Sequence, residues 1–148
     1  MSLESKLMPD LKSAMKAKDQ AALRGIRAIK AELLKFKTSG TGEELTADAE
    51  IKILQRLIKQ RQDSLSIYEE QGREDLAVVE REEIAVITNY LPAQMSQAEL
   101  ESKVKEIITQ TGASSMKDMG KVMGMASKAF AGKADGKSIS AMVKQLLS

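Results

Sequence analysis

The sequence predicts an all-α protein, and three observations support that prediction. Apolar residues recur at intervals of three and four along almost the whole chain, which is the spacing of one helix face. No segment alternates apolar and polar residues as a half-buried strand does. Glycine, proline or a capping side chain separates the periodic segments. We expect a bundle of about four helices over residues 1–92, followed by a small three-helix module over residues 93–148.

Four helical segments fill the N-terminal half. Each has apolar residues on one side and charged residues on the other, as expected of a helix that lies on a core. Asp19 and Thr46 suit the capping position before the second and third segments. Pro9 removes one hydrogen bond inside the first. The expected bounds are residues 3–17, 20–37, 47–71 and 74–89.

Three charged residues fall within the apolar stripes of the third and fourth segments. They are Arg61 on the third, and Glu80 and Glu83 on the fourth. A lone buried charge is costly, so such groups are found paired. Because Arg61 and Glu83 lie at similar distances from the short connection, they should meet at one level of an antiparallel pair. We expect a buried ion pair from Arg61 to Glu83 first and Glu80 second; a catalytic carboxylate pair or a metal site is the alternative.

Three further segments form the C-terminal half. Pro92 disfavours helix geometry in the residue before it, which places the domain boundary nearby. Ser96 and Glu99 form the sequence pattern of a capping box for the fifth segment, which ends at Gly112. The sixth segment is expected over residues 115–132, and the seventh, capped by Ser138, over residues 139–147.

The sixth segment has three distinct faces. Its expected apolar stripe consists of Met116, Met119, Met123, Ala126 and Phe130. Lys117, Lys121 and Lys128 fall on the opposite side. Gly120 and Gly124 lie between these faces, one turn apart, where another backbone or a ligand would come close. Gly132 ends the helix, and Lys133 and Lys137 follow. The methionine stripe favours core packing, with an adaptable peptide groove as the alternative.

The segment from Ala131 to Ser138 also matches a relaxed phosphate-loop pattern. That loop needs a buried strand before it, whereas here a helix precedes it. We therefore interpret it as the end of one helix, a turn at Asp135-Gly136, and the start of the next helix. No nucleotide or other cofactor is expected.

Composition excludes several classes of active site. The chain has no cysteine and no histidine, which removes zinc–thiolate sites, imidazole catalysis and cysteine nucleophiles. No acidic cluster has the spacing of a calcium loop, so we expect no metal site and no catalytic residues. There is no apolar N-terminal run and no stretch of membrane-spanning length, so we expect a cytoplasmic protein with no membrane partner.

The charge is distributed unevenly. The net charge is only +2, but residues 1–37 carry nine basic and four acidic groups, and residues 111–148 carry six and two. The middle of the chain is acidic. Both basic ends are consistent with solvated helix faces or with contacts to a polyanion. With only two tyrosines and two phenylalanines, a nucleic-acid partner would be folded RNA or a duplex, because single-strand binders stack bases on aromatic side chains.

Several stretches resemble the GatB/YqeY family. The C-terminal signature is matched by DMGKVMG (118–124), GKADGK (132–137) and VKQLL (143–147). Further matches are DLKSAMKAKD (10–19), LIKQRQDSLSIYEEQGREDL (57–76) and NYLPAQMS (89–96). The family contains stand-alone YqeY-like proteins and the tail domain of GatB, a subunit of the tRNA-dependent amidotransferase. Since the resemblance covers nearly the whole chain, it favours the stand-alone protein.

The resemblance implies a role without catalysis. In GatB the chemistry lies outside the tail domain, which is implicated in holding tRNA. We therefore expect a tRNA-binding or structured-RNA-binding module whose phosphate contacts are Lys117, Lys121, Lys128, Lys133 and Lys137. The alternative is an adaptor that docks amidotransferase subunits or a synthetase. A carbon–nitrogen ligase activity with glutamine as amido-N-donor would be inherited from the family name alone, because no residues here support it.

Overall fold

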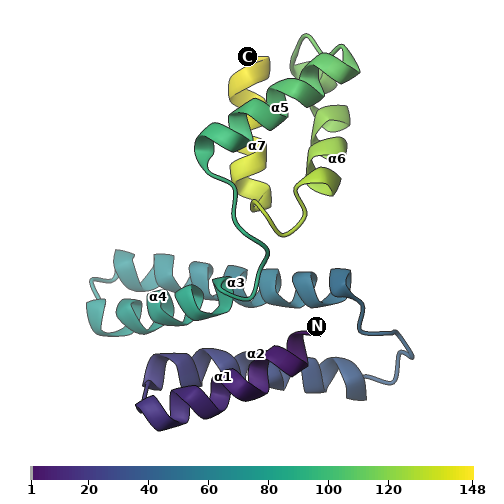
Figure 1. Cartoon of the computed structure of the whole chain (residues 1–148). Coiled ribbons are helices and arrows are strands. Elements are labelled where there is room, and N and C mark those ends of the chain that lie inside the picture. The colour runs from purple at the N-terminus through teal and green to yellow at the C-terminus, as the bar shows by residue number, and fades with distance from the viewer. Residues whose placement is uncertain (1) are drawn as a thin grey trace. The chain divides into compact units, whose positions relative to one another are not determined.

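The computed structural model, which describes residues 2–148, confirms the all-α fold (Figure 1). Seven α-helices and one short 3-10 helix account for the regular structure of these residues, and no strand occurs among them. The bounds are α1 Leu3–Ala17, α2 Gln20–Thr38, α3 Ala47–Glu70, α4 Glu74–Thr88, α5 Gln97–Thr111, η1 Met116–Asp118, α6 Met119–Ala129 and α7 Gly136–Leu147.

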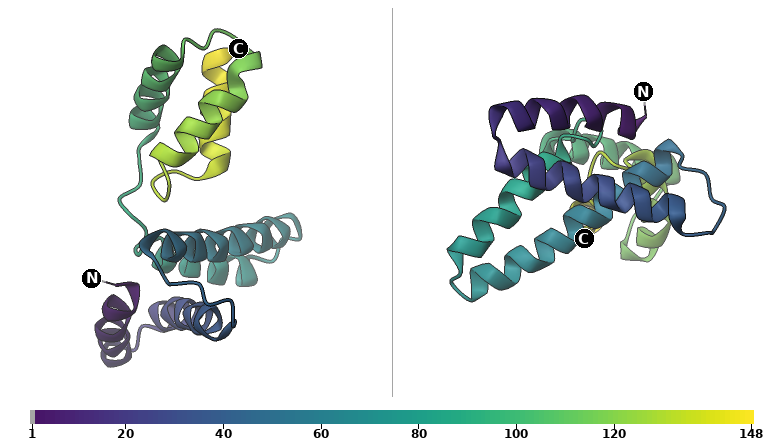
Figure 2. Two further views of the ribbon diagram at one scale, coloured as in Figure 1. Left: turned by 90° about the vertical axis from the view of Figure 1, so that its right-hand side faces the viewer. Right: turned by 90° about the horizontal axis from the view of Figure 1, so that it is seen from below.

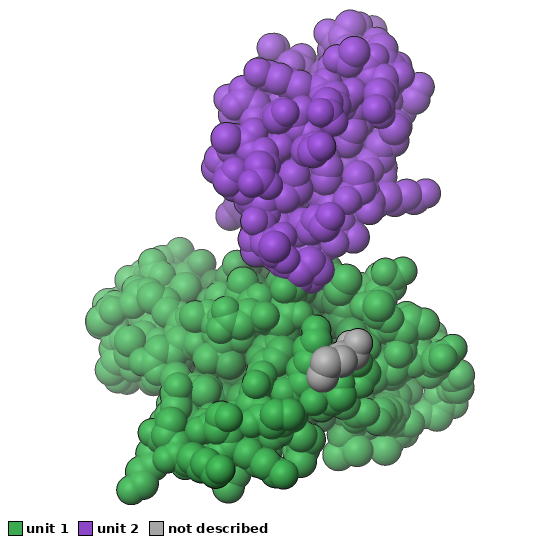
Figure 3. Space-filling model, in the orientation of Figure 1, with its two compact units in different colours: residues 1–91 green, residues 92–148 purple. Residues whose placement is uncertain are grey.

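The chain divides into two compact units, coloured separately in Figure 3. Unit 1 ends at Leu91 and contains α1 to α4, and unit 2 begins at Pro92 and contains α5, η1, α6 and α7. Each unit has a hydrophobic cluster of its own. The predicted arrangement of a four-helix bundle followed by three further helices is therefore confirmed.

Helix α2 occupies the centre of unit 1. It contacts α1, α3 and α4, while α3 and α4 pack against each other as an antiparallel pair (Figures 1 and 2). The largest fully buried side chains of this unit are Leu7, Ile29, Leu33, Leu54 and Ile87. They come from all four helices, so one hydrophobic core stabilises the whole of unit 1.

Gly25 lies where α2 packs closely against α4. A Cβ atom at this position would lie 2.5 Å from Val86 Cγ1 and 2.7 Å from Val86 Cβ. Side-chain carbons do not approach so closely, so only glycine allows the two helices to meet here without displacement. The sequence patterns gave no sign of this role.

Two local features fix the path of unit 1. Lys18 adopts the left-handed conformation with φ 55°, which ends α1, and Asp19 then caps α2 by accepting a hydrogen bond from Ala22 N. The Tyr90 hydroxyl donates to Asp10 Oδ2 at 2.6 Å and so ties the end of the unit to its first helix. Burial, followed by this hydrogen bond, raises the pKa of Tyr90.

The core of unit 2 joins α5, α6 and α7. Val104, Val122 and Val143 are completely buried, one from each helix. Met119 and Met123 are partly buried against this cluster, and Phe130 closes it at the end of α6. The predicted apolar stripe of the sixth helix therefore faces the core, with Val122 added and Met116 removed from it.

Two helix starts in unit 2 differ from the sequence prediction. The segment after Ser115 begins as the 3-10 helix η1, whose tighter winding turns Met116 outward, where it is 44% exposed. The Ser115–Asp118 capping box is present as predicted. Helix α7 starts at Gly136 instead of after Ser138, because Asp135 accepts a hydrogen bond from Ser138 N at 2.6 Å and takes the capping role.

Candidate nucleic-acid interface

The five lysines predicted to bind nucleic acid all belong to unit 2, and all are exposed. Lys121 and Lys128 lie on α6, seven residues apart, so they face nearly the same direction. Lys117 is in η1, Lys133 in the turn after α6, and Lys137 in the first turn of α7. The predicted set is thus distributed over one helix, its leading turn and the connection that follows it.

None of these lysines forms an ion pair within residues 2–148. The lysines of α5 behave differently: Lys105 pairs with Glu101 at 3.0 Å and Lys103 with Glu106 at 3.7 Å. Lys137 is also placed at a helix N-terminus, where the helix dipole disfavours a cation. The internal electrostatics of unit 2 therefore supply no partner for this group of charges.

Gly120 and Gly124 lie on the outside of α6, in open space. Apart from the neighbouring backbone of α6 itself, no atom of residues 2–148 lies within 4 Å of a Cβ built at either position. The predicted close approach of another backbone therefore does not occur within the described residues. Helical geometry places Gly124 about 40° from Lys128 and about 60° from Lys121 around the α6 axis, so the glycines border the lysine face. Glycine inside a helix costs about 1 kcal/mol relative to alanine, and nothing in the fold of this chain recovers that cost.

The turn carrying Lys133 is held by the segment that opens unit 2. Gln94 Nε2 donates to Gly132 O at 2.7 Å, and Met95 N donates to Lys133 O at 2.9 Å. Gly132 is buried and has φ 77°, which suits glycine at the end of a helix. Two of the stretches quoted above, NYLPAQMS and GKADGK, are thus joined by hydrogen bonds. Sequence reasoning did not find the role of Gln94, because a side-chain contact across 38 residues leaves no local pattern.

The methionines of α6 lie on different sides of the helix. Met119 and Met123 pack against the core, and Met125 is 40% exposed on the other side of the helix. Core packing therefore accounts for the predicted stripe.

Arg61 lies against Glu83 in unit 1. Its Nη2 is 3.9 Å from Glu83 Oε1, while its Nη1 donates to the Leu57 carbonyl at 3.0 Å. The two side chains are 17% and 15% exposed. The pair is therefore only partly buried, whereas the sequence predicted a fully buried pair between the helices. The Arg61 Nε is buried without a hydrogen-bond partner in the described part of the chain. Glu80 makes no ion pair with Arg61 within 4.0 Å.

Glu80 nevertheless experiences this charge cluster. Burial raises its pKa, the neighbouring Glu83 carboxylate raises it further, and Arg61 opposes both effects. Within residues 2–148, no three acidic side chains are grouped so as to hold a metal ion. The arrangement is that of a partly solvated ion pair with a second carboxylate beside it.

No helix in the described part of the chain is both long and apolar enough to cross a membrane.

Comparison with known proteins gives consistent matches. A family model described as Yqey-like protein matches residues 4–147. A protein of Lachancea thermotolerans named "Altered inheritance of mitochondria protein 41, mitochondrial" is 35% identical over 107 residues, which cover 70% of this chain and 57% of that protein. A protein of the same name from Pyrenophora tritici-repentis is 29% identical over 147 residues, which cover 96% of this chain and 79% of that protein.

These names correct one prediction. The relatives are named as mitochondrial proteins, so the expectation of a cytoplasmic location is wrong. That expectation used the absence of an apolar N-terminal run, which describes secretory signals. Mitochondrial targeting segments are amphipathic and arginine-rich, so the absence of an apolar run does not bear on them.

The family is established independently of those names. The match to the family model extends over nearly the whole chain and includes both compact units. The Lachancea relative exceeds 30% identity over more than two thirds of the chain. This chain therefore belongs to the family of YqeY-like proteins.

Proposed function

We propose that unit 2 binds tRNA or another structured RNA without catalysing a reaction, using the lysine face of α6 and the connection to α7. The observation that supports this proposal most directly is the unpaired state of the five lysines Lys117, Lys121, Lys128, Lys133 and Lys137 within residues 2–148. Exposed cations without an ion-pair partner are free to bind phosphate groups, and this attraction does not depend on the nucleotide sequence.

The glycines beside the lysines supply the second support. A nucleic-acid backbone must come close to a helix for lysine amines to reach its phosphates. Gly120 and Gly124 leave the α6 surface without side chains, and the space above them is open. The stability they cost the helix is then explained by a requirement of binding.

This interface would recognise shape and charge more than sequence. Lysine acts as a flexible point charge and does not make the bidentate contacts with which arginine reads a guanine. Aromatic residues are scarce in the chain, with two phenylalanines and two tyrosines, so stacking on unpaired bases contributes little. A folded RNA that presents closely spaced phosphates fits these properties best.

The experiment is a fluorescence-anisotropy titration of labelled tRNA with the full chain at several salt concentrations. We expect affinity that falls steeply as salt rises, because each phosphate contact releases a counterion. The double substitution Lys121→Gln and Lys128→Gln should weaken binding by about tenfold. The affinity should also depend less on salt, by about the amount expected for the loss of two phosphate contacts. The matched control is Lys105→Gln on α5, whose lysine already pairs with Glu101.

Two results would refute the proposal. One is the absence of binding at low salt. The other is binding that Lys105→Gln weakens as much, per charge removed, as the α6 double substitution does, since this would indicate attraction to net charge alone.

A protein-docking role is the alternative, favoured by the acidic middle of the chain next to its basic ends. Affinity capture with and without nuclease separates the two functions. Partners that survive nuclease support an adaptor for amidotransferase subunits or a synthetase, whereas partners that disappear support RNA binding.

A further inference from the structure

A pocket of about 660 Å³ opens between α1 and α2 in unit 1, far along the sequence from the lysines considered above. Its floor consists of Leu7 and Leu33, each only 1% exposed. Its walls include Met8 and Leu34, which are 47% and 63% exposed. Large apolar side chains this exposed, above a buried apolar floor, mark a surface that lacks its covering partner.

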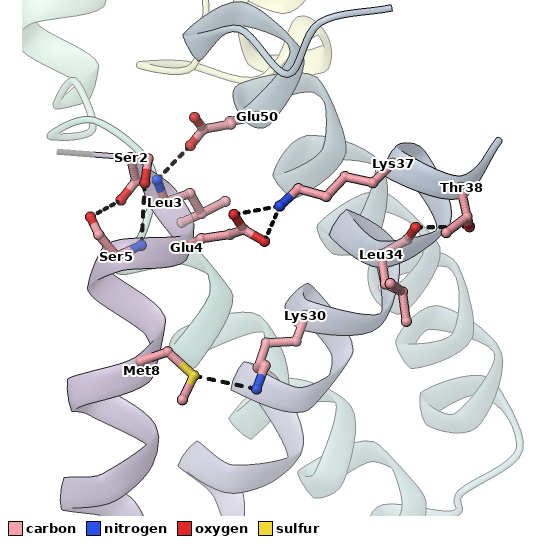
Figure 4. A network of polar contacts seen from close by, with 10 residues as sticks. All are labelled: Ser2, Leu3, Glu4, Ser5, Met8, Lys30, Leu34, Lys37, Thr38 and Glu50. Carbon is pink, nitrogen blue, oxygen red and sulfur yellow. Dashed lines mark hydrogen bonds and ion pairs between the residues drawn. The ribbon is translucent and has the colours of Figure 1, made fainter. Parts of the chain in front are cut away.

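Polar contacts between the two helices frame this pocket. At one end Lys37 Nζ donates to the Glu4 carboxylate at 2.6 Å. About one turn further along α1, Lys30 Nζ contacts the sulfur of Met8 at 3.5 Å (Figure 4). A thioether is a weak acceptor that carries no charge, so the Lys30 cation is left without an anion in the described residues. Leu3 N donates to Glu50 Oε2 at 2.8 Å and fixes the start of α1 against α3.

The two helices that line the pocket carry a net positive charge, because residues 3–38 contain nine basic and four acidic side chains. Helices α1 and α2 and their connection contain four carboxylates. Each of them forms an ion pair or a hydrogen bond within residues 2–148. Glu4 pairs with Lys37, Asp10 accepts from Tyr90, Asp19 caps α2, and Glu32 pairs with Lys35 and Arg56. In these two helices and their connection, the basic residues that form no ion pair with the rest of residues 2–148 are Lys6, Lys12, Lys16, Lys18, Arg27 and Lys30.

We propose that this pocket receives an acidic amphipathic helix of a partner protein. One or two leucine-like side chains of that helix would fill the space above Leu7 and Leu33. Its acidic residues would lie along the unpaired cations, with Lys30 as the nearest one to the pocket. Helix-in-groove recognition uses this combination of apolar anchors at i, i+3, i+4 and i+7 with flanking charges.

Features of the surface favour a helix over a small ligand. Met15, which is 57% exposed, follows Met8 by two helical turns on the same side of α1. Exposed apolar side chains therefore continue beyond the pocket for about 10 Å along the helix. Methionine adapts its shape to different apolar partners, as expected where an incoming helix must be accommodated. The site lies entirely in unit 1 and is independent of the RNA-binding proposal.

The test uses a fluorescein-labelled peptide of about 16 residues with leucines at i, i+3, i+4 and i+7, glutamates beside them and alanines elsewhere. Its polarisation is measured against the full chain. Leu34→Glu should reduce the affinity by at least about tenfold, and Lys30→Glu by about threefold to tenfold. The matched controls are Ile67→Glu on α3, where the native side chain is 51% exposed, and Lys52→Glu, which is also on α3. Both controls should bind as the native chain does.

Further arms identify other occupants. A peptide with lysines in place of the glutamates should bind at least about tenfold more weakly, and one with serines in place of the leucines should not bind. Equal binding of the lysine peptide, or unchanged binding by Leu34→Glu, would overturn the proposal. It would also be overturned if the acidic peptide failed to bind while anionic lipid vesicles did, or while the chain self-associated in a manner that Leu34→Glu abolished.

Discussion

The two units use glycine inside a helix in opposite ways. In unit 1, Gly25 is buried where α2 crosses α4, and a Cβ there would lie 2.5 Å from Val86 Cγ1. In unit 2, Gly124 is exposed on α6, and nothing lies within 4 Å of the same hypothetical atom. Both glycines weaken their helices, but only Gly25 repays that cost by internal packing. Gly124 therefore has no packing role among the described residues.

The two units also differ in which helices their ion pairs connect. In unit 1, Arg24 pairs with Glu82 at 2.8 Å and Arg56 pairs with Glu32 at 3.0 Å, so cations link one helix to another. In unit 2, ion pairs among the described residues lie along α5 alone. The lysines of α6 and of the following turn are left to solvent or to a partner.

The largest effect is expected at Gly25. Gly25→Ala should destabilise unit 1 by about 2 kcal/mol, because the added Cβ would overlap the stiff, branched side chain of Val86. Native-state hydrogen exchange, which reports each unit separately, measures this loss. Val86→Gly removes both close carbons, Cγ1 and Cβ, so the double variant should show a favourable coupling of at least about 1 kcal/mol. Additive losses would mean that the crossing is not what requires glycine.

The next largest effect concerns Arg61. Arg61→Met keeps an apolar stem but removes the hydrogen bond to the Leu57 carbonyl and the cation beside Glu83. We expect a loss of about 1.5 kcal/mol, between the values for exposed and buried ion pairs, because both side chains are partly exposed. Urea unfolding followed by circular dichroism checks it. Adding Glu83→Gln should restore part of the loss; a further loss of equal size would show that the pair is not coupled.

Helical periodicity anticipated this pair but not its surroundings. Matching the distances of Arg61 and Glu83 from one short turn needs only the rise per residue, so the sequence was sufficient to place them at one level. The 3.9 Å separation and the partial exposure depend on how deeply α3 and α4 interlock, which is a property of the whole unit. The same reason hides Gly25 and Gln94, whose partners are distant in sequence.

The starts of two helices in unit 2 were predicted only in part from their capping residues. The Ser115–Asp118 capping box was predictable from its spacing, but its 3-10 winding was not, and this error misplaced Met116. At α7 the predicted cap, Ser138, was wrong, because Asp135, three residues earlier, caps the helix. A carboxylate near a helix N-terminus gains from the dipole as well as from the hydrogen bond, which a serine does not.

A smaller effect of opposite sign is expected at Gly124. Gly124→Ala should stabilise α6 by about 0.5–1 kcal/mol, since alanine favours helix and the added methyl group meets open space. If a nucleic-acid backbone passes over this strip, the same substitution should weaken tRNA binding severalfold. Hydrogen exchange and tRNA anisotropy on one protein sample give both values. A stabilised variant with native tRNA affinity would remove the glycine strip from the proposed interface.

The smallest effect is a dependence of stability on pH that originates at Glu80. Its pKa is raised in the folded state by burial and by Glu83, so the folded protein holds this proton more tightly than the unfolded chain. The stabilisation is therefore present below the unfolded pKa and is lost as pH rises through the folded pKa. Glu80→Gln keeps the side chain neutral, so it should be more stable than the native protein at neutral pH and equal to it in acid.

Thermal unfolding across that pH range tests the sign. The matched control is Glu70→Gln on α3, which is exposed and forms no ion pair within residues 2–148. It should leave the pH profile unchanged. A Glu80→Gln variant that is less stable than the native protein at neutral pH would mean that attraction to Arg61 outweighs burial and the repulsion from Glu83. The attraction between Arg61 and the two carboxylates would then compensate the cost of burying Glu80.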